Sequence, residues 1–126
     1  MSTLKFDPAT LSIIINADIR GIHPTTARLV FDTGSSFVVL PWKLVTSIGI
    51  KIDPSKTVEI TSATTMETVP KIIIPEMKVM GKSVKNVEAI VKDLPLESPA
   101  DGLLGLSFLK HFKFIIDFKN GYLSLE

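Results

Sequence analysis

The residues best able to do chemistry lie together in one short segment of the chain. Asp32 follows an apolar run and is followed by Thr33, Gly34 and Ser35. Gly34 has no Cβ, so backbone N–H groups can approach the carboxylate closely, and the two hydroxyl side chains can donate further hydrogen bonds. A carboxylate that accepts several such bonds is held in one orientation. The segment therefore predicts an oriented carboxylate suited to acid–base chemistry.

The same three residues are also common turn chemistry, because Asp often caps the loop that follows it. A bare Asp-Thr-Gly match arises often by chance. Here the match continues into the apolar run 37–40 and then Pro41, which is suited to the start of a helix. The longer pattern favours a functional site over a simple turn.

A second segment lies about 70 residues after Asp32. It is an apolar run bounded by Gly102 and Gly105, and it leads into a short helical pattern. Two such glycines permit the close crossing of two backbone segments. Taken alone, this segment is typical of an ordinary buried strand with glycine turns.

Together the two segments resemble the retropepsin-like aspartic proteases, the dimeric relatives of pepsin. Residues 31–36 match the family's hydrophobic-Asp-Thr-Gly-(Ser/Ala) active-site loop, and 102–105 match the strand that threads past that loop. Residues 112–125 resemble the closing strands of the family. The resemblance covers roughly residues 11–125 and implies a mostly-β fold, a closed retropepsin-like barrel with one or two short helices.

The resemblance also implies roles for individual residues. Asp32 would be the catalytic aspartate, and Thr33 would bridge to its counterpart in a second copy. Gly34 would supply backbone donors, and Ser35 would hydrogen-bond the outer carboxylate oxygen.

The hairpin 61–68 would be the flap that covers the substrate. The tip of this hairpin consists of Ser62, Ala63, Thr64, Thr65 and Met66. It contains no glycine, which departs from the glycine-rich viral pattern and leaves efficient turnover open. A plain edge hairpin with threonine-rich faces explains these residues equally well.

The number of carboxylates determines the expected assembly. Peptide hydrolysis by this chemistry needs two aspartates that share one proton. The chain has one Asp-Thr-Gly, and neither Asp101 nor Asp117 has comparable surroundings. A twofold axis places the same residue of two copies side by side, so we expect a homodimer. The strand near 122–125, together with the N-terminal residues, is expected to contribute to the interface.

The composition narrows the class of protein further. The 126 residues carry a net charge of +1 and no Cys, and the two His, His23 and His111, lie far apart. We therefore expect one domain over 1–126, no metal or cofactor, no nucleic-acid partner, and a peptide or protein substrate. No leader or membrane-spanning pattern appears, so the expected location is cytoplasmic and no membrane partner is expected.

The elements expected to position these residues are short β-branched runs separated by turn signals. The expected helices are 42–48 and 105–111, and the expected strands are 11–19, 26–31, 37–40, 57–62, 67–74, 76–80, 83–92, 101–104, 114–118 and 122–125.

Three hypotheses remain at this stage. The leading one is a homodimeric aspartic endopeptidase. The second is a catalytically silent retropepsin-like domain that binds peptides or mediates assembly. The third is a small β-barrel binding module in which Asp-Thr-Gly is only a turn.

Overall fold

The computed structural model describes residues 2–61 and 64–126 as a mostly-β fold with two short helices. The elements in chain order are β1 (Ser2–Lys5), β2 (Ile14–Arg20), β3 (Pro24–Phe31), β4 (Val38–Leu40), α1 (Trp42–Ser47), β5 (Thr57–Thr61), β6 (Met66–Val79), β7 (Lys82–Val91), β8 (Gly102–Leu104), α2 (Leu106–Leu109), β9 (Phe114–Asp117) and β10 (Tyr122–Leu125).

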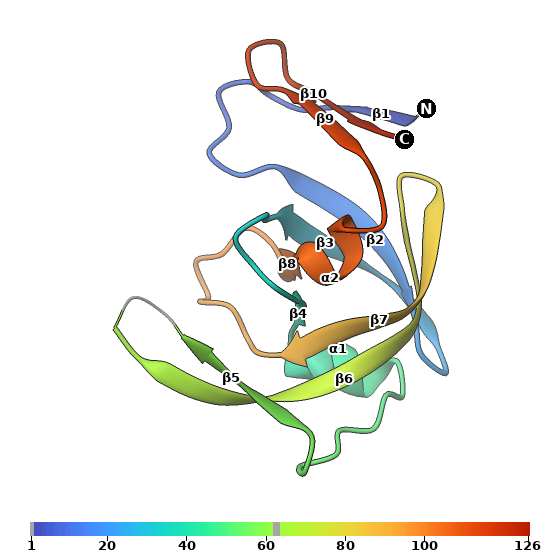
Figure 1. The fold of residues 1–126 in the computed structure, drawn as a ribbon, viewed down its shortest axis with the longest axis vertical. Helices are drawn as coiled ribbons and strands as arrows, with labels where there is room; N and C mark the ends of the chain where they lie inside the picture. The colour runs from blue at the N-terminus through green and yellow to red at the C-terminus, as the bar shows by residue number, and fades with distance from the viewer. Residues whose placement is uncertain (1, 62–63) are drawn as a thin grey trace.

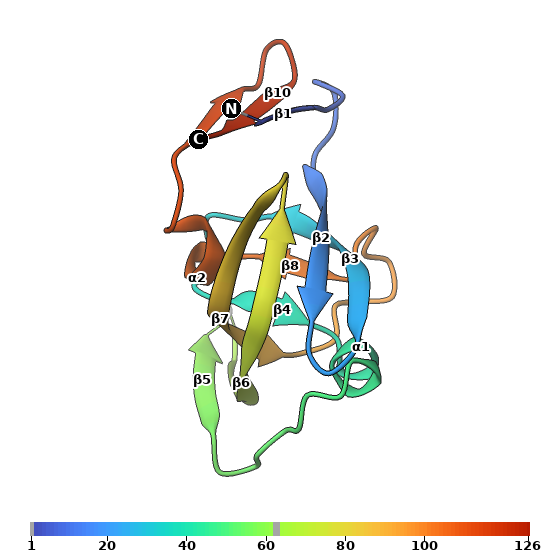
Figure 2. The same ribbon diagram turned by 90° about the vertical axis from the view of Figure 1, so that its right-hand side faces the viewer.

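The larger sheet closes into a barrel. Its strand order is β2-β3-β8-β4-β7-β6-β5. Because β2 also pairs with β6, the ring consists of six strands in the order β2-β3-β8-β4-β7-β6 (Figure 2). The β3–β8 and β4–β7 pairs are parallel, and the other pairs in the ring are antiparallel. β5 extends the sheet beyond this ring and pairs with β6 alone among the described strands. Closure pairs the strand edges that an open sheet would expose.

Alternation of side chains explains which face of each strand turns inward. In β2, Ile15, Ala17 and Ile19 are buried, whereas the residues between them are exposed. This period of two places one face of the strand in the core and the other in solvent. The core consists mostly of branched aliphatic side chains, and it also contains Phe108 of α2, which is fully buried.

β6 is one long strand, where the sequence had suggested two. The expected break fell at Pro75, which has no N–H to donate to a ladder. In the structure the β6–β7 ladder skips the position of Pro75 and resumes with Glu76 opposite Lys85, and Asn86 on the facing strand has a positive φ of 57°. This local irregularity accommodates a residue that has no N–H to donate, and the strand continues past it.

The two chain ends form a separate small sheet of order β1-β10-β9, which lies above the barrel in Figure 1. β1 was not predicted as a strand. Its register, from Ser2 opposite Leu125 to Lys5 opposite Tyr122, depends on residues at the far end of the chain. Leu123 and Leu125 of β10 are fully buried, so this sheet packs one face against the body of the protein.

The helices are short, as expected. α1 follows Pro41, which occupies the N-cap position, and it ends before Gly49, whose φ of 77° suits a helix stop. α2 has only four residues. Across the described residues, neither helix has the length and apolar character needed to cross a membrane.

The turn between β9 and β10 yields a prediction about pH. The Asn120 side chain and backbone donate to the Asp117 carboxylate, at 2.8 and 3.0 Å, and these bonds hold the pKa of Asp117 below its ordinary value of 3.8. A lowered pKa in the folded state stabilises the fold above pH 3.8, and this stabilisation is lost as pH falls through the lowered value.

We therefore expect Asp117→Ala to lower the melting temperature by a few degrees at neutral pH. The difference from the wild type should shrink as pH falls from 3.8 through the lowered pKa of Asp117, because the carboxyl group of the folded wild type then becomes protonated. Thermal unfolding of both proteins over this pH range measures the effect. A difference that does not change with pH would contradict this account.

Candidate active site

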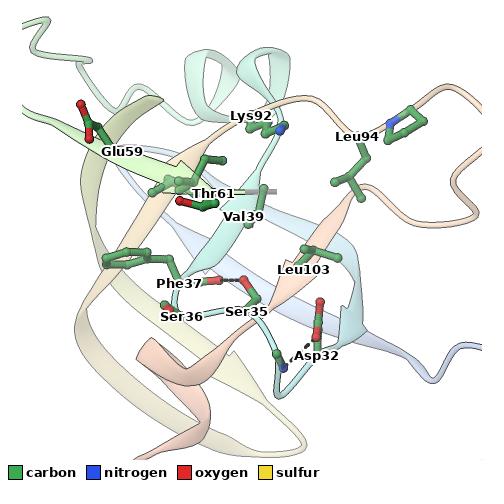
Figure 3. Close-up of a pocket in the computed structure, with 14 residues that line it drawn as sticks. Asp32, Ser35, Ser36, Phe37, Val39, Glu59, Thr61, Lys92, Leu94 and Leu103 are labelled. Atoms are coloured by element: carbon green, nitrogen blue, oxygen red, sulfur yellow. Dashed lines mark hydrogen bonds between the residues drawn. The ribbon is translucent and has the colours of Figure 1, made fainter. Parts of the chain in front are cut away.

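Asp32 lies directly after β3, where the chain leaves the barrel wall. Its backbone N–H donates to the Leu104 carbonyl of β8 at 3.1 Å, which fixes the start of the loop. The Gly34 N–H donates to Asp32 Oδ1 at 2.9 Å, which orients the carboxylate (Figure 3). The segment singled out by its sequence therefore holds an oriented carboxylate at the end of an apolar strand.

The two residues after Thr33 differ in how far they match their expected roles. A Cβ at Gly34 would lie 3.2 Å from Asp32 Oδ1, so glycine suits the close approach of this loop to the carboxylate. Ser35 donates its hydroxyl proton to the Phe37 carbonyl at 2.7 Å. A hydroxyl has one proton to donate. The expected bond from Ser35 to the outer carboxylate oxygen is therefore not made within the described part of the protomer.

β8 lies between β3 and β4, and its Leu104 carbonyl accepts the hydrogen bond from the Asp32 N–H. It pairs in parallel with β3 and meets β4 at Leu103 opposite Val39. A Cβ at Gly102 would come within 1.9 Å of the Val39 carbonyl oxygen, and one at Gly105 within 2.1 Å of the Phe37 carbonyl oxygen. The predicted close crossing is confirmed, and it leaves no room for any side chain at these two positions.

Ser107 is a structural residue that the sequence analysis did not identify. Its hydroxyl accepts a bond from the Val38 N–H at 2.9 Å and donates to the Glu88 carbonyl at 2.6 Å, while the residue is 8% exposed. A buried hydroxyl that is satisfied in this way cross-links β4, α2 and β7 behind the loop. A serine inside the apolar run 103–109 was the only signal of this role.

A cleft of about 490 Å³ opens beside Asp32. Gly34, Ser35 and Ser36 border it together with the carboxylate, and Glu59, Thr61, Lys92 and Pro95 also line it. The rest of its lining is apolar and comes from four different strands and two loops (Figure 3): Phe37, Val39, Ile60, Ile90, Leu94 and Leu103. None of these apolar residues was predicted as a site residue, because the fold alone brings them together.

The β5–β6 hairpin, for which the resemblance implied a covering role, borders this cleft. Its ladder runs from Thr57 opposite Pro70 to Thr61 opposite Met66. Of the predicted tip, Thr64, Thr65 and Met66 are exposed, whereas Ser62 and Ala63 lie outside the described residues. Ile60 and Thr61 contribute to the cleft lining.

The other carboxylates do not join Asp32. Glu59 lines the cleft from β5, on the opposite side of the view from Asp32 (Figure 3). Asp101 accepts a bond from the Arg28 N–H at 2.8 Å, so it secures the edge of β3. Asp117 caps the β9–β10 turn. Within the described chain, no three His, Cys, Asp or Glu side chains gather closely enough to hold a metal ion.

Thr33 lies on the other side of the loop. It is exposed, and with Asp32 it lines a second cavity of about 490 Å³. The remaining walls of this cavity come from the end of β3, from the loop before β2 and from β9 with the residue after it, and they include the exposed side chains of Leu11 and Phe118.

Comparison with known proteins assigns the chain to a family. The sequence model of the aspartyl protease family matches residues 15–108, so the chain belongs to that family. A crystal structure of a retropepsin-like aspartic protease from Rickettsia conorii matches with a TM-score of 0.71 and 24% identity, covering 97% of this chain and 96% of that one. No curated protein matches the chain. The predicted closed retropepsin-like barrel is confirmed.

The close approach of β8 to β4 predicts the effect of a minimal substitution. Gly102→Ala adds one methyl group against the Val39 carbonyl, and backbone cannot move aside as a side-chain end can. We expect a loss of roughly 1–3 kcal/mol in the free energy of unfolding, toward the upper end of the usual cost of overpacking.

Gly81→Ala is a suitable comparison for denaturant unfolding. A Cβ there has only Ser2 Oγ nearby, at 4.0 Å, so its cost is limited to the strain of a φ of 82°. Equal or smaller destabilisation by Gly102→Ala would contradict the tight crossing.

Proposed function

We propose that the protein is an aspartic endopeptidase whose catalytic pair forms across a homodimer. The observation that carries this proposal is the Asp32 carboxylate, oriented by Gly34 at one end of an apolar cleft that a β-hairpin borders. Membership of the aspartyl protease family supports the reaction class. In this proposal the whole chain acts as one domain that supplies one of the two aspartates.

The proposed chemistry needs two carboxylates that share one proton. The ionised carboxylate takes a proton from a water molecule, and the resulting hydroxide attacks the peptide carbonyl carbon. The protonated carboxyl group gives its proton to the carbonyl oxygen. The carboxyl group formed in the first step then gives its proton to the amide nitrogen as the C–N bond breaks. The other carboxylate takes a proton from a hydroxyl group of the tetrahedral carbon, which becomes the product carboxyl group, so the pair again holds one proton. Two close carboxylates hold one proton because both cannot ionise cheaply.

Three features support a second copy as the source of the other carboxylate. Among the described residues, Glu59 is the only other carboxylate that lines either cavity beside Asp32, and it comes from the hairpin strand β5. Thr33 is exposed next to it and faces a cavity that the protomer leaves open, which suits a bridge to the partner's Thr33. β1 and β9 form the two edges of the small terminal sheet, and such edges can pair with another chain.

The lining of the cleft supports a peptide substrate with apolar side chains near the scissile bond. Phe37, Leu94 and Leu103 are half-buried in the cleft lining and would be removed further from water by such side chains, which favours binding by about 25 cal/mol for each Å² of apolar surface buried. The hairpin would close over the bound segment and exclude water from the reacting carbonyl.

The substitution Asp32→Asn tests the catalytic assignment. Asn is nearly isosteric and can keep the bond from the Gly34 N–H, but it cannot take a proton from water. We expect peptide cleavage to fall by roughly 100- to 10,000-fold or more, with melting temperature and dimerisation retained. Activity of the wild type should survive EDTA.

A peptide library incubated with both proteins measures this effect, with melting and sedimentation run in parallel. Cleavage by the Asn variant at the wild-type rate would remove Asp32 from the mechanism. If neither protein cleaves any peptide but both dimerise, the silent peptide-binding domain becomes the better account, consistent with the glycine-free tip among 62–66.

Thr33→Arg tests the homodimer. A twofold axis beside Thr33 would bring two added charges together, so we expect the sedimenting species to shift from a dimer to the 13.8 kDa protomer. Thr46→Arg adds the same charge at an exposed position of α1, outside both cavities, and should leave the dimer intact. A wild type that sediments only as a protomer at micromolar concentration would rule out the proposed assembly.

A further inference from the structure

The outer part of the β5–β6 hairpin extends beyond the backbone ladder of the barrel. The β6–β7 ladder ends where Lys71 lies opposite Ile90. β6 continues beyond this point to Met66, and along that stretch its ladder partner is β5 (Figure 1). The position of this outer part relative to the cleft therefore depends on side-chain contacts.

One face of the hairpin turns toward the cleft wall. Val58 lies opposite Val69, and Ile60 lies opposite Glu67, so these four side chains share one face. The three apolar ones pack into a hydrophobic cluster whose other members include four residues of the cleft lining: Val39, Ile90, Leu94 and Leu103. Glu67 is thus a carboxylate on the packed face of the hairpin.

Lys92 meets this carboxylate from the cleft wall. It follows β7 directly, lines the cleft, and places its Nζ 2.7 Å from Glu67 Oε2. The two side chains are 35% and 49% exposed. The ion pair therefore connects the outer hairpin to the cleft wall at a point where no β6–β7 backbone ladder does so.

A second ion pair joins β6 directly to β7, and there the two strands are already held by a backbone ladder. Lys71 Nζ is 3.0 Å from Glu88 Oε1, with similar exposure. Both residues, however, lie within the span that the β6–β7 ladder already holds together. This ion pair has the same chemistry, but the backbone ladder already restrains the two strands there. It is therefore a matched control.

We propose that Glu67 and Lys92 are positioning residues that hold the flap hairpin against the cleft wall, so that the hairpin closes over a bound peptide. Their contribution to catalysis rests on the proposed function, whereas their hold on the hairpin can be measured without catalysis. An exposed ion pair contributes modestly, so its loss should change the closed population by ~2- to 5-fold.

The position of the hairpin can be measured with spin labels, because the chain has no Cys of its own. Met66→Cys on the hairpin and Leu96→Cys on the loop after β7 introduce labels at two exposed sites, 67% and 102% exposed. Diluting the labelled protein with excess unlabelled protein restricts each measured pair to one protomer. Double electron–electron resonance then gives the distribution of distances between the two labels.

In this labelled background, Glu67→Gln and Lys92→Gln should each broaden the distribution toward longer distances. The double charge reversal Glu67→Lys with Lys92→Glu should restore it, and Glu88→Gln should leave it unchanged. With a peptide that the wild type cleaves, the two single variants should raise KM by ~2- to 5-fold with little change in kcat, because the lost interaction stabilises the ground and transition states alike.

The outcomes separate this inference from the proposed function. An unchanged distance distribution in Glu67→Gln overturns the inference whether or not the protein cleaves peptides. Broadening that the charge reversal fails to restore also overturns it, because the effect would then not belong to the pair. Broadening with restoration supports it, and if the wild type still cleaves no peptide, only the protease function fails.

Discussion

The rest of the site depends on one close backbone crossing, that of β8 past the loop that carries Asp32. Gly102 and Gly105 allow the strand to come so near that a methyl group at either position would overlap a carbonyl oxygen. This close approach allows the Asp32 N–H to donate a hydrogen bond to the Leu104 carbonyl, and the Leu106 N–H to donate one to the Ser35 carbonyl at 2.8 Å. Buried backbone groups that pair in this way keep the carboxylate loop in one place.

The same crossing links the loop to the barrel and to the cleft. β8 lies between β3 and β4, so the ring of strands closes only if it is present. Ser107, just beyond β8, ties β4 to β7 through two hydrogen bonds in the core. Leu103 turns its side chain into the cleft beside Asp32. Support for the carboxylate and part of the apolar lining therefore come from one short segment.

Two cavities lie on either side of the Asp32 loop, and their linings differ. The cleft side combines an apolar lining with the Lys92–Glu67 ion pair at the hairpin. The Thr33 side opens onto a cavity with exposed apolar side chains near the terminal sheet. A protomer that offers one oriented carboxylate between two such surfaces suits a site that a second copy completes, as proposed above.

The amino-acid sequence predicted a mostly-β fold, Asp32 at the end of an apolar strand and a close crossing that Gly102 and Gly105 permit, because local residue types and their spacing carry that information. The closed barrel followed from the resemblance to the retropepsin-like proteases. Tertiary structure alone decided the rest. β1 pairs with residues about 120 positions away, and Glu67 of β6 meets Lys92 just after β7. Each of these contacts depends on strand register, which no local pattern specifies, because a shift of one residue turns every side chain of a strand to its other face.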